Sequence, residues 1–436
     1  MSQERNVDPT RPDVLVIGAG PSGSALSLRL ARRGWRVTVI DRARFPRPKP
    51  CGEFISPGAV RALARLGFPP GSFAESAAQL RGWSLQVGDR SVSAEFSGNG
   101  RGFSLPRSTF DHRLLAQARA AGAQVHTGTR FVRCSHWAGD GDPGVEVRSA
   151  RGLMTLRPRV LVGAGGLRCP VAAQLDVSKR PARIKKVSLT SRVRGVGLRP
   201  DMGRLFVRGD LTIGLAPSDP AGDEWNATVV VPSAVYGRRI ARGAVGFFHE
   251  SLARAGVMTG GTTYESDNHP EPGLWASGPF DRPTATFHKG RIVLVGDAGG
   301  YFDPFTGQGI YQALRSAEVL GAELSRALSG AATYQQAFES YGRIVERERS
   351  ATTRVQRAVE WALSEGRQDL VMRGLARTPG RYGEILDVTT DTDTLWKRAI
   401  RLGRRTGPTE AAPNVTGPPV PGSYVRGPAN QLRGPI

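Results

Sequence analysis

Apolar runs that lead into glycine-rich turns are the clearest pattern in the chain. The first run, Val14–Ile17, precedes Gly18-Ala-Gly-Pro-Ser-Gly23, and a second run, Val37–Ile40, ends on Asp41. Short continuous apolar runs bounded by turn residues are typical of buried strands. Because the spacing between the runs leaves room for one helix, we predict a strand, a helix and a second strand here.

The same pattern returns twice further along the chain. The apolar run Val160–Gly163 enters another glycine turn, and Ile292–Val295 leads into Gly296-Asp297. Between these runs the pattern changes to alternation, as in Val187–Val193 and Asn226–Val231, which is typical of an antiparallel sheet. We therefore expect an antiparallel substrate domain inserted into a nucleotide-binding domain.

Apolar residues at helical spacing predict helices over residues 58–66, 105–121 and 333–363, with a strand around 124–132. The longest of these helices has candidate packing positions at Phe338, Tyr341, Val345, Val355, Val359 and Trp361. A further helix is expected around 395–404. Residues 407–436 are rich in Pro and Gly and lack apolar periodicity, which predicts a flexible tail.

The first glycine turn has the spacing G-x-G-x-x-G. Gly18 permits a tight turn off the first strand, Gly20 lets backbone approach a pyrophosphate, and Gly23 allows the next helix to pack close to the sheet. Phosphates would lie at the start of that helix, where free N–H groups favour anions. Asp41 is placed to accept hydrogen bonds from ribose hydroxyls. The segment therefore predicts a dinucleotide site.

A second motif follows the apolar run at 292–295. It contains Gly296-Asp297 and, after Asp303-Pro-Phe-Thr, a helix that begins near Gly307–Gly309. Asp297 can accept hydrogen bonds from a polyol, and the free N–H groups of a helix start can stabilise a developing anion. Gly-Asp is also an ordinary turn pair, but together with the first motif it strengthens the prediction of a nucleotide cofactor.

Composition adds limits on partners. The chain has 436 residues, enough for more than one structural unit, and a formal net charge of +22 that comes almost wholly from arginine. The arginines are dispersed without interleaved aromatic residues, so nucleic acid is not expected as a partner. A GC-rich coding sequence would produce the same bias. The alternative explanation of the positive charge is that the protein binds an acidic partner, such as a carrier protein or a CoA thioester.

Residues 1–11 are polar, and no apolar run approaches the roughly 18 residues of a membrane span. We therefore expect a cytoplasmic protein with neither a signal peptide nor a transmembrane helix. The three cysteines, Cys51, Cys134 and Cys169, have no CxxC spacing and no neighbouring histidine cluster. Neither a disulfide framework nor a metal site is expected.

With both motifs in view, the chain resembles the FAD-dependent oxidoreductases that include aromatic hydroxylases, flavin-dependent halogenases and geranylgeranyl reductases. The resemblance covers about residues 13–330. Cys51-Gly-Glu-Phe-Ile-Ser-Pro57 and Asp303-Pro-Phe-Thr-Gly-Gln-Gly-Ile-Tyr311 are most similar to the geranylgeranyl reductase-like branch. The resemblance implies that Asp41 binds the ADP half of FAD, Arg107 reaches the flavin linker and Asp297 binds the ribityl chain. The implied cofactor-binding residues are Gly18, Gly20, Pro21, Ser22, Gly23, Asp41, Arg42, Arg107, Val132, Gly296, Asp297, Pro304, Gly307, Gln308 and Gly309.

The predicted fold is α/β, with a Rossmann-type FAD-binding domain, an inserted antiparallel-sheet substrate domain and C-terminal helices. The FAD-binding domain is expected over residues 12–182 and 283–330, and the substrate domain over 183–282. Residues 331–406 form the expected C-terminal helical region, and 407–436 form the tail.

One departure from the family concerns the electron donor. Hydroxylases of this family carry Gly-Ala-Asp-Gly where this chain has Gly163-Ala-Gly-Gly166. Because the family associates that motif with NAD(P)H as well as FAD, either NAD(P)H or a separate flavin reductase is expected to supply electrons. Halogenation is disfavoured, since the chain has no W-x-W-x-I-P element and no lysine between Lys49 and Lys179.

Cys51 and Glu53 are the candidate catalytic residues. They follow Pro46, Pro48 and Pro50, which preclude a helix and predict an extended loop. The resemblance implies that Cys51 faces the flavin and donates a proton or shapes the substrate pocket; the alternative is a small buried residue at a tight turn. Glu53 is expected either to act as an acid or orient the loop, or to form a salt bridge with an arginine.

The resemblance implies an FAD-dependent monooxygenase that hydroxylates an aromatic or polyketide-like small molecule in a biosynthetic pathway, through a flavin C4a-hydroperoxide. One alternative is a geranylgeranyl reductase-like enzyme that reduces C=C bonds of an isoprenoid or enone. Another is a non-catalytic module that binds FAD or a carrier protein. The sequence does not separate these functions, because fold does not fix chemistry.

Overall fold

A six-stranded sheet carries the nucleotide-binding elements. The computed structural model describes residues 8, 10–73, 75–135, 141–177, 185–257, 260–262, 273–364 and 366–390. The strands of this sheet are β1 (Val14–Ile17), β2 (Val37–Asp41), β8 (Gln124–Thr127), β12 (Val160–Gly163), β19 (His288–Lys289) and β20 (Ile292–Leu294). Their order is β19-β20-β12-β1-β2-β8, and every pair is parallel except β19-β20.

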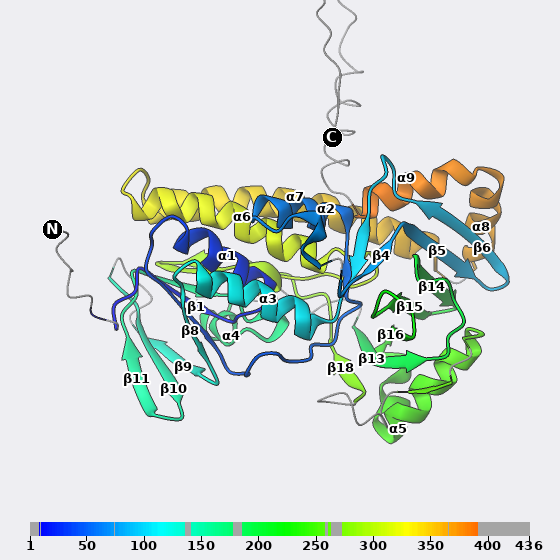
Figure 1. Cartoon of the computed structure of the whole chain (residues 1–436), viewed down its shortest axis with the longest axis horizontal. Coiled ribbons are helices and arrows are strands. Elements are labelled where there is room, and N and C mark those ends of the chain that lie inside the picture. Colours follow the sequence, from blue (N-terminus) through cyan, green and yellow to red (C-terminus); the bar gives the residue numbers. More distant parts are fainter. Residues whose placement is uncertain are drawn as a thin grey trace, which may run out of the picture. The chain divides into compact units, whose positions relative to one another are not determined.

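Both faces of the four inner strands β20, β12, β1 and β2 are buried, which explains why these strands are continuous apolar runs. Val14 and Val16 of β1 pack into one core, while Leu15 and Ile17 pack into another. The first core is covered by α1 (Pro21–Ala31), α3 (Arg107–Ala120), α6 (Gly309–Leu328) and α7 (Tyr334–Ala362). The second is covered by β9 (Arg130–Ser135), β10 (Gly144–Ser149), β11 (Gly152–Leu156) and α4 (Pro170–Leu175). Figure 1 shows these layers.

The strand expected around 124–132 is two strands. β8 joins the parallel sheet and β9 joins the antiparallel three-stranded sheet, with Gly128 between them at a φ of +70°. Glycine adopts this left-handed conformation without the steric cost that other residues carry. The chain therefore changes sheets at a point where apolar periodicity alone shows no break.

A second, larger sheet has eight strands. Its strands, in order, are β17 (Gly261–Thr262), β13 (Lys186–Arg194), β16 (Glu224–Pro232), β15 (Leu211–Pro217), β14 (Met202–Arg208), β5 (Gly82–Val87) and β6 (Arg90–Glu95), with β18 (Trp275–Ser277) also paired to β13. The two segments whose alternation predicted an antiparallel sheet lie in β13 and β16, and these two strands are antiparallel neighbours. However, β5 pairs in parallel with β14, so the sheet is not confined to residues 183–282.

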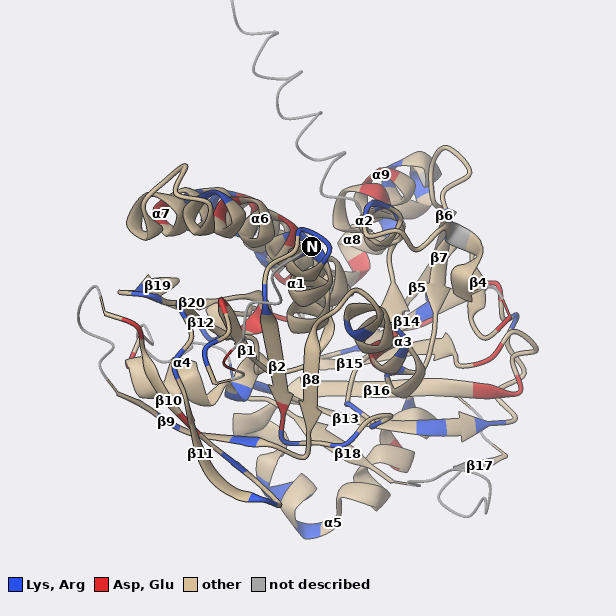
Figure 2. Cartoon of the chain, turned by 60° about the vertical axis from the view of Figure 1, so that its left-hand side comes forward, with Lys and Arg blue, Asp and Glu red and all other residues tan. Residues whose placement is uncertain are grey.

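The remaining elements surround these two sheets. They are β3 (Phe54–Ile55), β4 (Ala78–Leu80), β7 (Gly102–Ser104), α2 (Pro57–Arg65), α5 (Ser233–Arg254), α8 (Gln368–Arg377) and α9 (Pro379–Thr390). Lys and Arg residues are spread over helices and strands along the chain (Figure 2). None of the helices in the described ranges combines the length and apolarity that a bilayer crossing requires.

The long C-terminal helix predicted over 333–363 is α7. Thr333 and Gln336 form a capping box at its start, which satisfies backbone groups that a helix end leaves unpaired. The prediction that Trp361 is a packing position is wrong, because this residue is 63% exposed near the end of the helix. The helix expected around 395–404 and the tail 407–436 lie outside the described residues.

Candidate functional site

A cavity of about 1210 Å³, including its open mouth, runs from the carboxyl ends of β1 and β2 to the start of α6. We call it the cofactor cavity. Parallel sheets bind ligands at this edge, where the connections from neighbouring strands diverge. The predicted site residues that line it are Gly18, Gly20, Pro21, Ser22, Asp41, Cys51, Glu53, Arg107, Asp297, Pro304, Gly307 and Gly309.

The three glycines of the first motif differ in what surrounds them. Gly18 has a φ of +114°, and a Cβ there would lie 2.5 Å from the Ala164 carbonyl oxygen. A Cβ on Gly23 would lie 1.9 Å from the Gly18 oxygen, so Gly23 packs α1 against the turn and does not line the cavity. Gly20 instead faces open space, with Arg47 Nη2 nearest at 3.9 Å. No side chain caps α1, so its first N–H groups are available to an anion.

Two guanidinium groups share one buried carboxylate beside this helix start. Arg107 binds Asp111 through Nε–Oδ1 at 2.8 Å and Nη2–Oδ2 at 2.9 Å. Arg47 Nη1 lies 3.5 Å from the same carboxylate, and within the described part of the chain it is buried without a hydrogen bond. One carboxylate balances only one of the two cations, so the pair retains a positive charge. The sequence analysis missed Arg47, because its role depends on Asp111, which lies 64 residues away in the chain.

Asp41 ties the first motif to the end of β2. Its Oδ2 accepts a hydrogen bond from the Ala19 N–H at 2.8 Å, and its Oδ1 accepts one from the Ala43 N–H at 2.9 Å. The side chain also lines the cofactor cavity. Asp41 therefore orders the turn and presents a carboxylate to the cavity.

A second cavity adjoins the first at Asp41, and we call it the cationic cavity. Its basic lining residues are Arg42, Arg47, Lys49, Arg130 and Arg168, and Trp275 lies across from β2. The cofactor contact predicted at Val132 is not made by its side chain, which is 41% exposed and lines neither cavity. Neighbouring residues in a strand point to opposite faces, and here Phe131 takes the inner face.

Asp297 lies at the other end of the cofactor cavity. Its carboxylate accepts no hydrogen bond from the side chains and backbone that the structure describes. Burial raises the pKa of Asp297, and the positive charges of Arg349, Arg107 and Lys49 oppose this shift. A partly buried carboxylate without donors, facing a cavity, is suited to the hydroxyls of a polyol. Gly296 does not line the cavity; its N–H donates to Ser316 Oγ at 3.1 Å beneath the site.

The start of α6 borders the same end of the cavity. Gly307 has a φ of +64°, Gln308 is the N-cap, and no side chain caps the helix. Gln308 is buried, with its amide donating to the Thr389 carbonyl and its Oε1 left without a partner among the described residues. Free N–H groups at this helix start therefore face the space beside Pro304 and Gly307.

The loop that carries Cys51 and Glu53 is held from two sides. Glu53 Oε1 accepts from the Arg107 N–H at 2.9 Å and from Arg192 Nη2 at 2.7 Å. Asn226 Nδ2 donates to the Cys51 carbonyl at 2.6 Å. Glu53 is 5% exposed, and it forms an ion pair with Arg192. This is the salt bridge that the sequence offered as one alternative for this residue. The Cys51 thiol lies beside the Arg107 guanidinium.

A third cavity, the apolar cavity, shares walls with the cofactor cavity at Gly52, Phe54, Thr228, Pro304 and Gly307. Its other walls come from the second sheet, the end of α7, α8 and α9. These walls include Trp83, Leu85, Leu205, Leu215, Val230, Phe305, Val359, Leu363, Val371, Leu375, Tyr382, Ile385 and Leu386. The lining is apolar except for threonine hydroxyls and Tyr382, so the cavity suits an apolar molecule lying beside Pro304 and Gly307.

The residues present fit FAD. Gly20, the uncapped α1 and the Arg47 guanidinium suit a pyrophosphate. Asp41 and Asp297 offer carboxylates to ribose and ribityl hydroxyls, and the uncapped α6 suits a developing negative charge on a flavin. The described residues contain no cluster of His, Cys, Asp or Glu side chains that could hold a metal ion.

Comparison with known proteins supports this assignment. Residues 11–207 and 276–359 match the family described as FAD binding domain. A menaquinone reductase of Mycolicibacterium smegmatis is 27% identical over 348 residues, which cover 76% of this chain and 80% of that protein. A digeranylgeranylglycerophospholipid reductase of Methanothrix thermoacetophila is 26% identical over 345 residues, which cover 76% and 82%.

Among solved structures, the fold is similar to that of PqsL from Pseudomonas aeruginosa, which was solved in complex with 2-aminobenzoylacetate. The TM-score is 0.66 and the identity 21%, and the alignment covers 83% of this chain and 100% of PqsL. At this identity the likeness concerns the fold alone. The family match covers well over half of the chain and includes both glycine motifs. The chain therefore belongs to the FAD binding domain family and is an FAD-dependent oxidoreductase.

Proposed function

We propose that this protein is a monooxygenase that hydroxylates an extended apolar molecule with an aromatic head. The observation that carries the proposal is the wall shared by the apolar cavity and the cofactor cavity at Pro304 and Gly307. A molecule that fills the apolar cavity would present one end to the place where a flavin ring fits. FAD, when bound, supplies the redox chemistry.

The residues of this chain would bind and orient the substrate and exclude water. Thr190 and Thr228 lie on paired strands with their hydroxyl oxygens 3.1 Å apart. Both line the cofactor cavity, and Thr228 also lines the apolar cavity. This pair of hydroxyls is placed to bind a phenolic or keto oxygen on the aromatic head of the substrate. The apolar walls would hold the rest of the substrate and keep water away from the reacting atoms.

Electrons would come from NAD(P)H or from a partner flavin reductase. The basic side chains of the cationic cavity favour direct binding of an anionic dinucleotide. Anaerobic addition of NADH or NADPH to the FAD-loaded protein separates the two routes. Bleaching of the flavin absorbance supports direct reduction, and an unchanged spectrum that bleaches only with an added flavin reductase supports the partner.

The reaction itself is tested with the reduced, FAD-loaded protein and alkyl-substituted phenols in the presence of labelled oxygen gas. Mass spectrometry is expected to show addition of one oxygen atom that carries the label. Products without the label, or no product across short and long alkyl chains, would contradict the hydroxylation proposal.

The second candidate is a reductase of C=C bonds, favoured by the likeness to two reductases and by the Cys51-Gly-Glu segment that the family match includes. In this case prenyl or enone compounds would gain two hydrogens under nitrogen. Cys51→Ser separates the candidates, because a thiol that donates the proton is needed for reduction but not for oxygen insertion. Cys134→Ser, at a buried cysteine outside the cofactor cavity, is the matched control.

A further inference from the structure

We propose that the outer face of α8, together with Trp361 at the end of α7, docks on the surface of an anionic lipid bilayer. We call this set the membrane face; its members are Trp361, Arg367, Leu370, Arg373, Arg377 and Ile385. The further step, that an apolar substrate passes from the bilayer into the apolar cavity here, rests on the proposed function. The docking itself does not.

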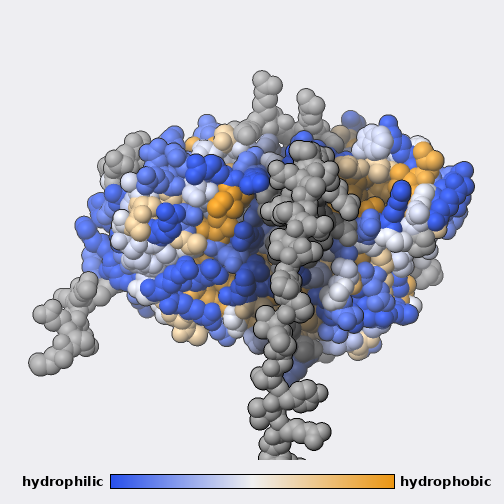
Figure 3. Space-filling model, turned by 90° about the horizontal axis from the view of Figure 1, so that it is seen from above, coloured by the Kyte–Doolittle hydropathy of each residue, from blue (hydrophilic) through white to orange (hydrophobic). Residues whose placement is uncertain are grey.

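The first observation is apolar exposure. Leu370 is 75% exposed, the highest value among the large hydrophobic residues in the described ranges, and Trp361 is 63% exposed. Each leaves apolar area in water that burial would stabilise by about 25 cal/mol per Å². A tryptophan is also the residue type that favours the boundary between headgroups and acyl chains. Figure 3 shows hydrophobic side chains among hydrophilic ones at the end that carries α8 and α9.

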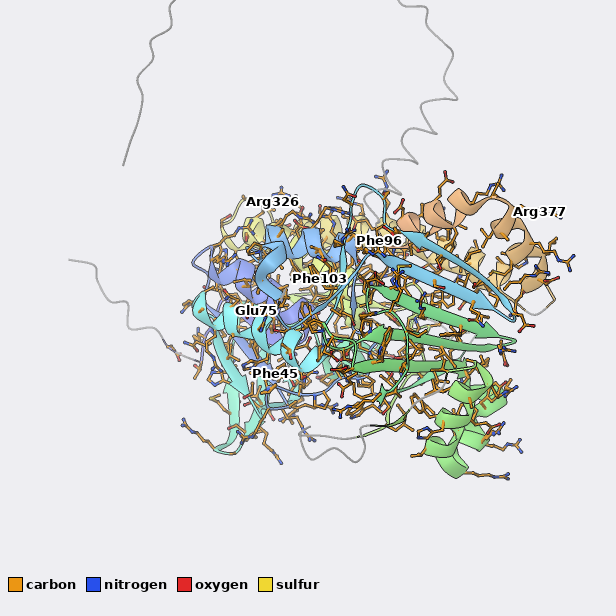
Figure 4. All side chains as sticks on the ribbon, turned by 45° about the vertical axis from the view of Figure 1, so that its right-hand side comes forward. Phe45, Glu75, Phe96, Phe103, Arg326 and Arg377 are labelled. Atoms are coloured by element: carbon orange, nitrogen blue, oxygen red, sulfur yellow. The ribbon has the colours of Figure 1, made fainter. Side chains whose placement is uncertain are left out.

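The second observation is the arrangement of charge on α8. Leu370, Arg373 and Arg377 follow one another at helical spacing, so they share one face of α8. The opposite face packs inward through Met372 and Leu375. Arg377 extends away from the molecule at the end of this helix (Figure 4). This face therefore offers an apolar side chain together with cations, and juxtaposed cations attract anionic lipids.

The end of α7 continues this face. The Arg367 guanidinium lies 4.7 Å from the centre of the Trp361 ring, so the aromatic residue and the cation reach the surface together. Arg373 pairs with Asp369 on its own helix, and Asp369 also pairs with Arg90 of β6. The remaining arginines of the face, Arg367 and Arg377, have no ion pair with an acidic residue within the described ranges and are available to lipid phosphates.

The third observation is continuity with the apolar cavity. Val371 and Leu375 of α8 line that cavity, and so does Ile385 of α9. Ile385 is also 39% exposed, so the cavity wall reaches the surface at the membrane face. Docking here would bring the apolar lining to the level of the acyl chains, where an apolar substrate is most concentrated. An anionic bilayer therefore explains the exposed apolar residues, the arginines and the nearby cavity together.

Vesicle flotation of the full-length, FAD-loaded protein tests the docking. Vesicles of equal parts phosphatidylglycerol and phosphatidylcholine are expected to carry the protein, and vesicles of phosphatidylcholine alone to carry much less. Leu370→Ser and Trp361→Ala should each lower the partition roughly tenfold, through the lost apolar burial. Arg377→Gln should lower it about fivefold. Val235→Ser on α5, where the valine is 63% exposed, is the matched control and should change nothing.

Two results would overturn the proposal. One is no flotation with either vesicle. The other is flotation that Leu370→Ser and Trp361→Ala leave at the level of the unsubstituted protein, because binding would then come from elsewhere on this basic chain. FAD absorbance of each variant shows that it is folded. Flotation needs no turnover, and the hydroxylation assay with short-chain phenols needs no membrane, so failure of the docking and failure of the proposed function can be told apart.

Discussion

Asp297 and Asp41 present carboxylates to opposite ends of the cofactor cavity, yet their surroundings differ. Asp41 already accepts two backbone hydrogen bonds, whereas Asp297 accepts none from the described residues. Burial raises the pKa of Asp297, as expected for a carboxylate that has no hydrogen-bond donor among the described residues. Asp297 is therefore the residue whose hydrogen bonds depend most on bound FAD.

Asp297→Asn is expected to weaken FAD binding roughly tenfold or more, because an acceptor for charge-assisted hydrogen bonds becomes a neutral amide. Fluorescence titration of the apoprotein with FAD measures this change. Asp89→Asn is the control, since that side chain is fully exposed. Equal affinity in both variants would show that Asp297 does not contact the cofactor.

Glu53 is a residue at which several elements meet. It binds the start of α3 through the Arg107 N–H, and it binds β13 through Arg192. Its φ is +56°, a conformation that costs energy outside glycine. The surrounding contacts therefore hold a strained loop in place, and this loop carries Cys51 and Gly52 along the cavities.

Glu53→Ala is expected to lower the free energy of unfolding by about 3–5 kcal/mol, because the buried Arg192 would lose its short ion pair and keep only the longer one to Glu224, at 3.8 Å. Denaturant unfolding at a fixed FAD concentration checks this value. In the double variant Glu53→Gln/Arg192→Met the uncompensated charge is absent, so most of the loss should be recovered. A double variant as unstable as Glu53→Ala would refute the buried-charge explanation.

At the scale of elements, one lysine joins a strand, a helix and the loop that separates the two cavities. Lys186 at the start of β13 lies 3.2 Å from Asp303 and also pairs with Glu360 of α7. Asp303 opens the segment Asp303–Gly307, and its Oδ1 accepts from the Phe305 N–H at 2.8 Å. Lys186 therefore positions the loop whose Pro304 and Gly307 line both cavities.

Lys186→Met is expected to shift the absorption maximum and midpoint potential of bound FAD and to make stability depend on pH. Burial already raises the pKa of Glu360, and the lysine opposes that shift. Without the lysine, folded Glu360 would hold its proton to higher pH than the unfolded chain does. The folded state then binds more protons, so the free energy of unfolding falls as pH rises through that range.

Spectra and urea unfolding at several pH values measure these effects. Lys186→Arg keeps the cation and should restore both the flavin spectrum and the weaker pH dependence of the unsubstituted protein. A methionine variant that loses stability equally at all pH values, with an unchanged flavin spectrum, would leave Lys186 with a packing role alone.

At the scale of the whole molecule, the apolar cavity is assembled from distant parts of the chain. Trp83 and Leu85 come from β5, Leu215 from β15, and Leu375 and Leu386 from the C-terminal helices. The size of the apolar cavity, and with it the substrate size under the proposed function, is therefore set by contacts between elements rather than by any one motif. Gly214 of β15 lines this cavity, and a Cβ there would meet only Leu205 Cδ2 at 3.8 Å.

Gly214→Val is expected to fold and to retain FAD, because the added methyl groups point into empty space and no cofactor residue is touched. It should lower kcat/KM about tenfold or more for long-chain phenols, while short-chain phenols are affected little. Steady-state kinetics on a chain-length series measures this difference. Equal losses at every chain length would show that the substrate does not occupy the apolar cavity.

Local sequence patterns were sufficient to predict the nucleotide-binding half of the protein. Gly18 and Gly23 lie where an added Cβ would clash, and the apolar runs on either side form the central parallel strands. These features are local, since turn conformation and strand burial depend on neighbouring residues. The family match agrees with the cofactor that they predicted. The same local reasoning predicted α3, α7 and the antiparallel character of β13 and β16.

The rest of the site depends on how distant parts of the chain pack together, and the structure was needed to show it. This packing paired Arg47 with Asp111, turned the Val132 side chain away from the cofactor cavity, and brought β5 beside β14. It also closed the apolar cavity with α8 and α9. Each of these depends on side chains that are far apart in the chain, and hydrophobic periodicity does not say which distant surfaces meet. The residues that fit the cofactor are therefore predictable from local sequence. The apolar cavity proposed for the substrate, in contrast, forms only once the sheets and helices have packed.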